Sequence, residues 1–181
     1  MAESDLKARP WFAINADTPA VRPPSTTPPP AAMQVPENAA YRPAPGARSS
    51  VLVAMSVTSY HDVAVVRHRL QQVLHGYDRD VVQDVELVAT ELLSNALEHA
   101  RPPCGVTVTS HVPRDTTGWS RLGEVVIEVL DGSCELLPLL DRSTSGSHRG
   151  RGMRLVRALS RSWGVLRSGR TKTVWAAMHP V

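Results

Sequence analysis

Beyond residue 50, apolar residues recur at steps of three and four over two stretches of the chain, which is the spacing of one helix face. From Asp62 to Leu74 this spacing predicts an amphipathic helix, and Gly76 is placed to end it. A longer stretch begins at Asp80, a suitable N-cap residue, and carries a wide apolar stripe up to Ala100. Pro102 and Pro103 follow, so the second helix should end just before them.

The other apolar runs are short and rich in β-branched residues, a pattern typical of strands. They predict a first strand from Val51, two strands in the middle of the chain and a hairpin at its end, namely Val106 to Val112, Glu124 to Leu130, and Val165 to Arg167 with Thr173 to Met178. Helical spacing returns from Met153 to Ser160. This order predicts an α+β fold, a two-layer sandwich with the helices on one face of a mostly antiparallel sheet.

The N-terminal segment has a different composition. Ten of the 15 prolines precede residue 46, and proline lacks the N–H donor that helices and sheets need. We therefore expect residues 1–48 to be a disordered tail and residues 49–181 to form one domain. A proline-rich tail can serve as a ligand for a partner domain, but a simple solvated extension is the more frequent case.

A net charge of +3 and 42% hydrophobic residues are typical of a globular domain rather than of an acidic disordered chain. No apolar run reaches the roughly 20 residues of a membrane span. Charged residues between Met1 and Pro10 argue against a signal peptide. We therefore expect a cytoplasmic protein without membrane contact.

Cysteine and histidine do not form a metal-binding pattern. Cys104 and Cys134 lack the paired spacing of a zinc site, and we expect buried, reduced thiols. His61, His68 and His75 follow one another at about 10 Å along the first predicted helix, so they cannot share one ion and are expected at the surface.

Candidate chemistry begins with Glu91 and Asn95, which are four residues apart on the second helix and point to the same side. Their neighbours are mostly apolar, which isolates one polar edge that Glu98 and His99 extend by another turn. Most such pairs are simply solvated, so this pair needs support from elsewhere in the chain.

Support comes from Asp131, at the end of an apolar strand. A buried carboxylate needs hydrogen-bond donors, and the exocyclic amine of adenine is one, although an ordinary Asp-Gly turn has the same sequence. Further along, Gly150 and Gly152 open a helix, where free N–H groups and the helix dipole attract phosphate. Arg149 and Arg151 can pair with phosphate oxygens or stay solvated.

In this order and spacing, four segments resemble one family: Glu91 to Ala100, Val129 to Ser133, Gly150 to Val156 with Trp163 and Gly164 after it, and Thr171 to Trp175. From about residue 50 to residue 179 the chain is similar to the anti-sigma-factor serine kinases. These form a branch of the gyrase- and histidine-kinase-like ATPases, and the likeness is greatest to the short regulators abundant in streptomycetes.

The resemblance implies a role for each motif residue. Glu91 matches the general base that deprotonates a serine hydroxyl or water, and Asn95 matches the ligand of the Mg²⁺ ion that bridges the phosphates. Asp131 matches the carboxylate that binds adenine, with Thr173 as its helper. The lid that closes over ATP is expected at Leu136 to Arg149. The phosphate-binding segment contains Arg149, Gly150, Arg151 and Gly152.

For the whole protein, the resemblance implies an ATP- and Mg²⁺-dependent serine/threonine kinase. Its substrate would be an anti-anti-sigma partner of the STAS type, and it would sequester a sigma factor when that partner is absent or phosphorylated. One departure bears on catalysis, because the family pattern Asp-x-Gly-x-Gly reads Asp131-Gly-Ser-Cys-Glu here and lacks the glycines that shape the floor of the adenine pocket.

Two alternatives remain open. In the first, the protein is a non-catalytic switch in which nucleotide only controls partner binding. In the second, it binds nucleic acid, since residues 149–172 contain eight Arg or Lys and no acid. However, Arg154, Arg157 and Arg161 repeat at helical spacing, as on a solvated helix face, and we expect no direct nucleic-acid contact. Homodimers are common among the resembled kinases.

Overall fold

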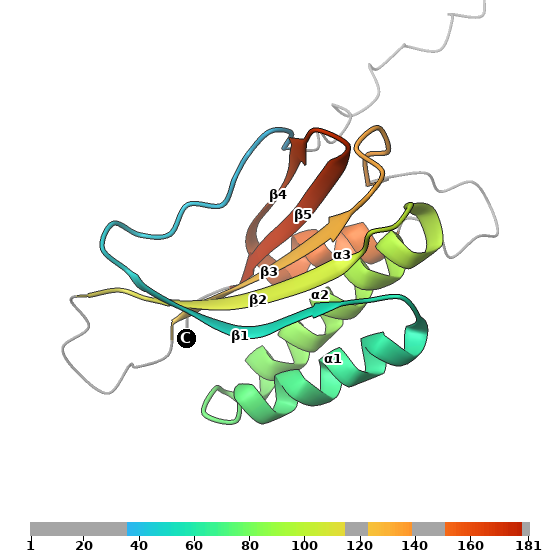
Figure 1. The fold of residues 1–181 in the computed structure, drawn as a ribbon. Helices are drawn as coiled ribbons and strands as arrows, with labels where there is room; N and C mark the ends of the chain where they lie inside the picture. Colours follow the sequence, from blue (N-terminus) through green and yellow to red (C-terminus); the bar gives the residue numbers. More distant parts are fainter. Residues whose placement is uncertain (1–35, 115–122, 139–150, 179–181) are drawn as a thin grey trace, which may run out of the picture. The chain divides into compact units, whose positions relative to one another are not determined.

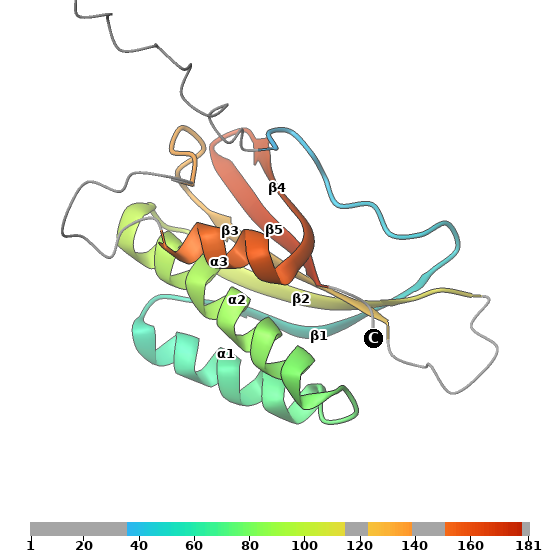
Figure 2. The ribbon, with the colours of Figure 1, turned by 180° about the vertical axis from the view of Figure 1, so that it is seen from behind.

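The computed structural model describes residues 36–114, 123–138 and 151–178. Its elements are, in chain order, β1 (Arg48–Ser56), α1 (Tyr60–Val73), α2 (Arg79–His99), β2 (Gly105–Val112), β3 (Glu124–Asp131), α3 (Arg151–Leu159), β4 (Ser160–Ser168) and β5 (Thr171–Met178). Within the described residues the strands form one five-stranded antiparallel sheet in the order β1-β2-β3-β5-β4. The helices of the described segments cover one face of it (Figure 1, and from behind in Figure 2). This is the predicted α+β two-layer fold.

Local capping fixes where the first two helices begin. In α1, the Ser59 side chain accepts a hydrogen bond from the backbone N–H of Asp62, and the Asp62 carboxylate accepts one from the backbone N–H of Ser59. In α2, the cap is Asp78, whose carboxylate accepts from the N–H of Asp80 at 2.8 Å. The sequence prediction of Asp80 as the cap was wrong because either aspartate can cap. Asp80 lies in the first turn, where its charge still complements the helix dipole.

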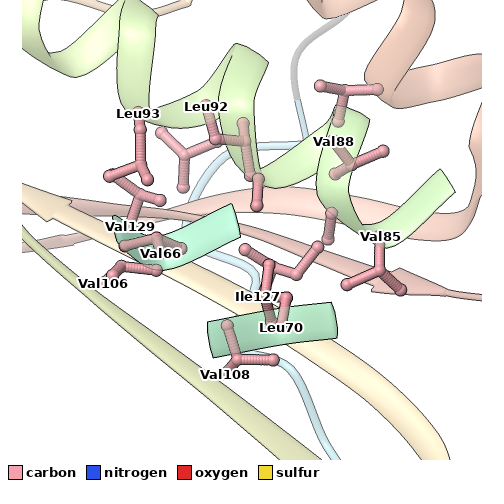
Figure 3. Packing of buried hydrophobic residues seen from close by; sticks show 14 of the residues in the cluster. Val66, Leu70, Val85, Val88, Leu92, Leu93, Val106, Val108, Ile127 and Val129 are labelled. Carbon is pink, nitrogen blue, oxygen red and sulfur yellow. The ribbon is translucent and has the colours of Figure 1, made fainter. Parts of the chain in front are cut away.

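A large apolar cluster fills the space between the helices and the sheet (Figure 3). Leu70 of α1, Val85, Val88 and Leu93 of α2 and Ile127 of β3 are all completely shielded from solvent. Burying one such side chain contributes about 1.5–3 kcal/mol. Because the apolar stripe of α2 faces the sheet, α2 is held at a fixed depth, and its polar residues lie at the edge of the stripe.

The hairpin that ends the domain is longer than predicted. The third helix was predicted to reach Ser160, but α3 ends at Leu159 and β4 begins directly after it. Trp163 and Val165 are buried on the helix side of the sheet. Between them, a side chain at Gly164 would come within 2.9 Å of the Trp175 ring, so glycine here leaves room for that ring to lie across the strand. The turn contains Gly169, whose φ of 60° favours glycine.

Residues 36–47, shown in blue in Figure 1, begin beside the edge strand β4, where Glu37 forms an isolated parallel bridge with Val165, and place Ala39 and Tyr41 on the sheet face opposite the helices. The backbone N–H of Val165 donates to the carbonyl of Pro36 at 2.9 Å, and the Trp175 indole N–H donates to the carbonyl of Ala39. The ring of Tyr41 packs edge-on against Trp175, and its hydroxyl donates to Glu124 at 2.6 Å.

The last part of the predicted tail, residues 1–48, is therefore packed against the sheet rather than disordered. Trp175 faces away from the helices, and residues of this segment cover its ring. The first part of the predicted tail, up to residue 35, lies outside the described residues.

Candidate functional site

A cavity of about 450 Å³ opens between α2, α3 and the inner face of β3 and β5. Its wall is mostly apolar, and its polar side chains come from separate elements, which is typical of a small-molecule site. The residues that line it are Leu92, Asn95, Ala96, Glu98, His99, Val129, Asp131, Leu136, Leu137, Pro138, Met153, Lys172 and Val174. The cavity thus brings together Asn95 and Asp131, which are far apart in the sequence.

At one end of the cavity, α2 and the first turn of α3 come into close contact. An added Cβ at Gly152 would overlap the Glu91 carboxylate and lie 3.6 Å from Nδ2 of Asn95. A side chain at this position would have to displace the carboxylate end of Glu91. The structure thus places three predicted site residues, Glu91, Asn95 and Gly152, beside one another.

The side-chain amide of Asn95 is incompletely paired. Its Nδ2 atom is buried and has no hydrogen-bond partner among the described residues. Buried polar groups nearly always have partners, so an orphaned amide at a cavity wall is typical of a site that a ligand completes. Asn95 also lines the cavity, whereas Glu91 and Gly152 lie just behind it.

At the other end of the cavity, Asp131 forms a buried ion pair that the sequence analysis missed. The Lys172 ammonium donates to Oδ1 of Asp131 at 2.7 Å, and the side chains are only 6% and 3% exposed, respectively. The same Oδ1 accepts from the backbone N–H of Ser133 at 2.9 Å, and Lys172 also donates to the Ser133 carbonyl at 3.0 Å. These charge-assisted bonds fix the carboxylate and compensate its burial.

Thr173, the predicted helper of Asp131, does not reach the cavity. Asp131 pairs with Lys172 across β3 and β5, whereas Thr173 pairs with Leu130, and neighbouring residues of a strand point to opposite faces. Thr173 lines a shallow hollow on the opposite face, next to Glu128. The sequence contained the necessary signal, because Val174 is a core position and its two-residue period places Lys172 on the inner face.

The turn after Asp131 is more than an ordinary Asp-Gly turn. The backbone N–H of Gly132 donates to the carbonyl of Arg101 at 2.8 Å, and the Arg101 N–H donates to Oγ of Ser133 at 2.8 Å. A side chain at Gly132 would overlap the carbonyl oxygens of Arg101 and Pro102. The end of β3 is thereby tied to the segment that follows α2, which fixes the two ends of the site relative to each other.

Some predicted residues cannot be placed. Arg149 and Gly150 lie outside the described residues, and Arg151 begins α3 without a described side chain. Of the predicted lid, Leu136 to Arg149, only residues 136–138 are described, and all of these line the cavity.

Other predictions concern residues outside the cavity. His61, His68 and His75 are exposed as predicted, and the described residues contain no cluster of three or more His, Cys, Asp or Glu that could hold a metal ion. Cys104 and Cys134 are free but half-buried rather than fully buried. No helix in the described segments is long and apolar enough to cross a membrane.

Comparison with known proteins agrees with this geometry. Residues 57–178, about two thirds of the chain, match the model of the histidine kinase-like ATPase domain. A search of curated proteins found no match. Domains of this kind bind ATP, typically with Mg²⁺, and the cavity lies among the residues of the matched segment. The chain belongs to the histidine kinase-like ATPase family.

Proposed function

We propose that this protein binds Mg²⁺·ATP in the cavity and acts as a cytoplasmic serine/threonine protein kinase on an anti-anti-sigma partner of the STAS type. When that partner is absent or phosphorylated, the protein binds a sigma factor. The observation that carries the catalytic part is that Glu91 and Gly152 lie beside Asn95, which lines the cavity. The resemblance of the sequence motifs to anti-sigma-factor kinases supports the choice of partner.

The cavity suits a purine nucleotide. Apolar side chains of Leu92, Val129 and Met153 give the base a dry surface, and Asp131 offers a fixed acceptor for its exocyclic amine. The opposite end, at Asn95, is then left for the phosphates.

The residues at the phosphate end also fit a Mg²⁺ ion. Amide and carboxylate oxygens are the ligands that Mg²⁺ prefers, and Asn95 at the cavity wall and Glu91 beside Gly152 carry one of each. The atom of Asn95 that is unpaired among the described residues is its amide nitrogen Nδ2, a donor that suits a phosphate oxygen. When bound, the ion would neutralise phosphate charge. Gly152 lies in the first turn of α3, where backbone N–H groups lack partners within the helix and can bind phosphate oxygens.

In this proposal the Glu91 carboxylate is the general base. It takes the proton from a partner serine hydroxyl as the serine oxygen bonds to the γ-phosphorus, and the bond to the β-phosphate oxygen breaks to release ADP. Its position beside Gly152 holds it next to the segment that would bind the γ-phosphate.

Transfer of labelled phosphate from ATP to a candidate STAS-domain protein, in the presence of Mg²⁺, tests this proposal. Wild type should label a partner serine, and Glu91→Ala should lose at least about a hundredfold in rate while still binding ATP. Asp84→Asn is a matched control, because this carboxylate lies on the same helix away from the cavity. Label transfer that survives Glu91→Ala would refute the assigned base.

The same experiment separates the kinase from a non-catalytic switch. If wild type binds ATP and captures its partner only in one nucleotide state, yet never transfers label, the kinase assignment is wrong. Nucleotide then acts through its different affinity for two states of the protein.

A further inference from the structure

Lys172 combines deep burial with an unused hydrogen-bond donor. It is the only lysine after residue 7, and its side chain is 6% exposed at the cavity wall. A lysine ammonium carries three N–H donors. Two of them go to Asp131 and to the carbonyl of Ser133, and the third finds no acceptor among the described residues.

Asp131 likewise has unused hydrogen-bonding capacity, in its case as an acceptor. The hydrogen bonds that it receives from described residues, from Lys172 and from Ser133, both end on Oδ1. Its other oxygen, Oδ2, is therefore available to a ligand. The ion pair offers one acceptor and one donor side by side in a cavity whose other walls are mainly apolar, such as Val129 and Val174.

This pattern complements the edge of one nucleobase. Adenine presents an N6 amine, which donates, next to N1, which accepts. We propose that Lys172 determines base specificity: its ammonium donates to N1 of adenine while Oδ2 of Asp131 accepts from the N6 amine. This inference rests on the proposed ATP-binding function and extends it, because the family resemblance assigned base recognition to Asp131 and Thr173.

Guanine fits this pair poorly. Its edge carries O6, N1–H and a 2-amine, so the pair can serve at most O6 and N1–H. The ion pair leaves the 2-amine unserved, and a buried donor without an acceptor weakens binding by roughly tenfold or more. The protein should therefore prefer ATP to GTP by at least about tenfold.

The first arm of the test compares two ligands on the wild-type protein, and the second arm compares variants. ATP and 1-deaza-ATP, which lacks only the N1 acceptor, are titrated into the full-length wild-type protein with Mg²⁺. A hydrogen bond to a charged donor corresponds to about a tenfold to hundredfold change in affinity, so wild type should bind 1-deaza-ATP that much more weakly than ATP.

The Lys172→Met variant supplies the second arm. It should bind ATP at least about tenfold more weakly than wild type and should no longer distinguish ATP from 1-deaza-ATP. Arg170→Met is the matched control, because it removes a nearby exposed cation that does not line this cavity. That control should keep the wild-type preference.

The outcomes are distinct. If wild type binds ATP and 1-deaza-ATP equally well, Lys172 does not contact N1 and the inference fails, although ATP binding itself stands. If wild type binds neither nucleotide, the proposed function fails together with it. If Arg170→Met loses the preference as well, the effect belongs to net charge and the inference is overturned. The wild-type comparison holds even if Lys172→Met does not fold.

Discussion

The buried pair of Lys172 and Asp131 should be strongly coupled in the folded protein without nucleotide. Because both side chains are almost fully buried, removing one partner leaves the other buried without its counter-charge, with only its hydrogen bond to Ser133 among the described residues. Lys172→Met and Asp131→Asn should each lower the free energy of unfolding by about 3–5 kcal/mol. Domains of this size are stable by about 5–15 kcal/mol, so either change is severe.

The double variant should recover most of this loss. Replacing both members of a buried ion pair by uncharged groups is often close to neutral. We therefore expect Asp131→Asn combined with Lys172→Met to lie within about 1–2 kcal/mol of wild type. Urea unfolding followed by tryptophan fluorescence measures this, since Trp163 and Trp175 are only 9% and 6% exposed. Losses that simply add in the double variant would refute the reasoning, because they would mean that the two charges do not interact.

Three further predictions concern the site. Asn95→Ala should remove most of the gain in ATP affinity that Mg²⁺ gives. It should lose little stability, because Nδ2 makes no hydrogen bond in the described residues. Calorimetric titration of ATP with and without EDTA measures the Mg²⁺ effect, and an unchanged effect in the variant would contradict the prediction. Gly152→Ala should slow phosphate transfer at least about tenfold by displacing Glu91, and an unchanged transfer rate would show that the carboxylate has no fixed role. Burial first, and then the charge of Asp131, raise the pKa of the Cys104 thiol, while Lys172 lowers it. Alkylation of Cys104 by iodoacetamide at pH 8 should therefore be slow in wild type and slower still in Lys172→Met. Faster alkylation in that variant would contradict the prediction.

The helical part of the site could be predicted from the sequence because it depends on local spacing. Glu91 and Asn95 share one side of α2 because residues four apart are neighbours on a helix with about 3.6 residues per turn, and the end of α2 follows from the prolines after it. The order of the elements along the chain and the two layers follow from the helical and strand periods, whereas the order of the strands within the sheet comes from the structure alone.

The sequence predictions fail in two situations. Some contacts join residues far apart in the chain, and one residue was assigned from the family motif although the strand period indicated another. Thr173 was assigned from the motif, although the two-residue period of β5 places Lys172 on the inner face. Ordering of residues 36–47 depends on Trp175, which lies more than 120 residues further along, and no local pattern reveals that contact. The two-residue period places Lys172 on the inner face, but its partner Asp131 lies 41 residues away, so the ion pair itself is a non-local contact.

The central claim is that the cavity between α2, α3, β3 and β5 is a purine nucleotide site with Asp131 at its base-binding end. Calorimetric titration of ATP into wild type and Asp131→Asn, both with Mg²⁺, tests this claim most directly. We predict saturable binding of one ATP per chain to wild type and at least about tenfold weaker binding to the variant. Absence of binding to wild type, or equal affinity in the two proteins, would contradict the account.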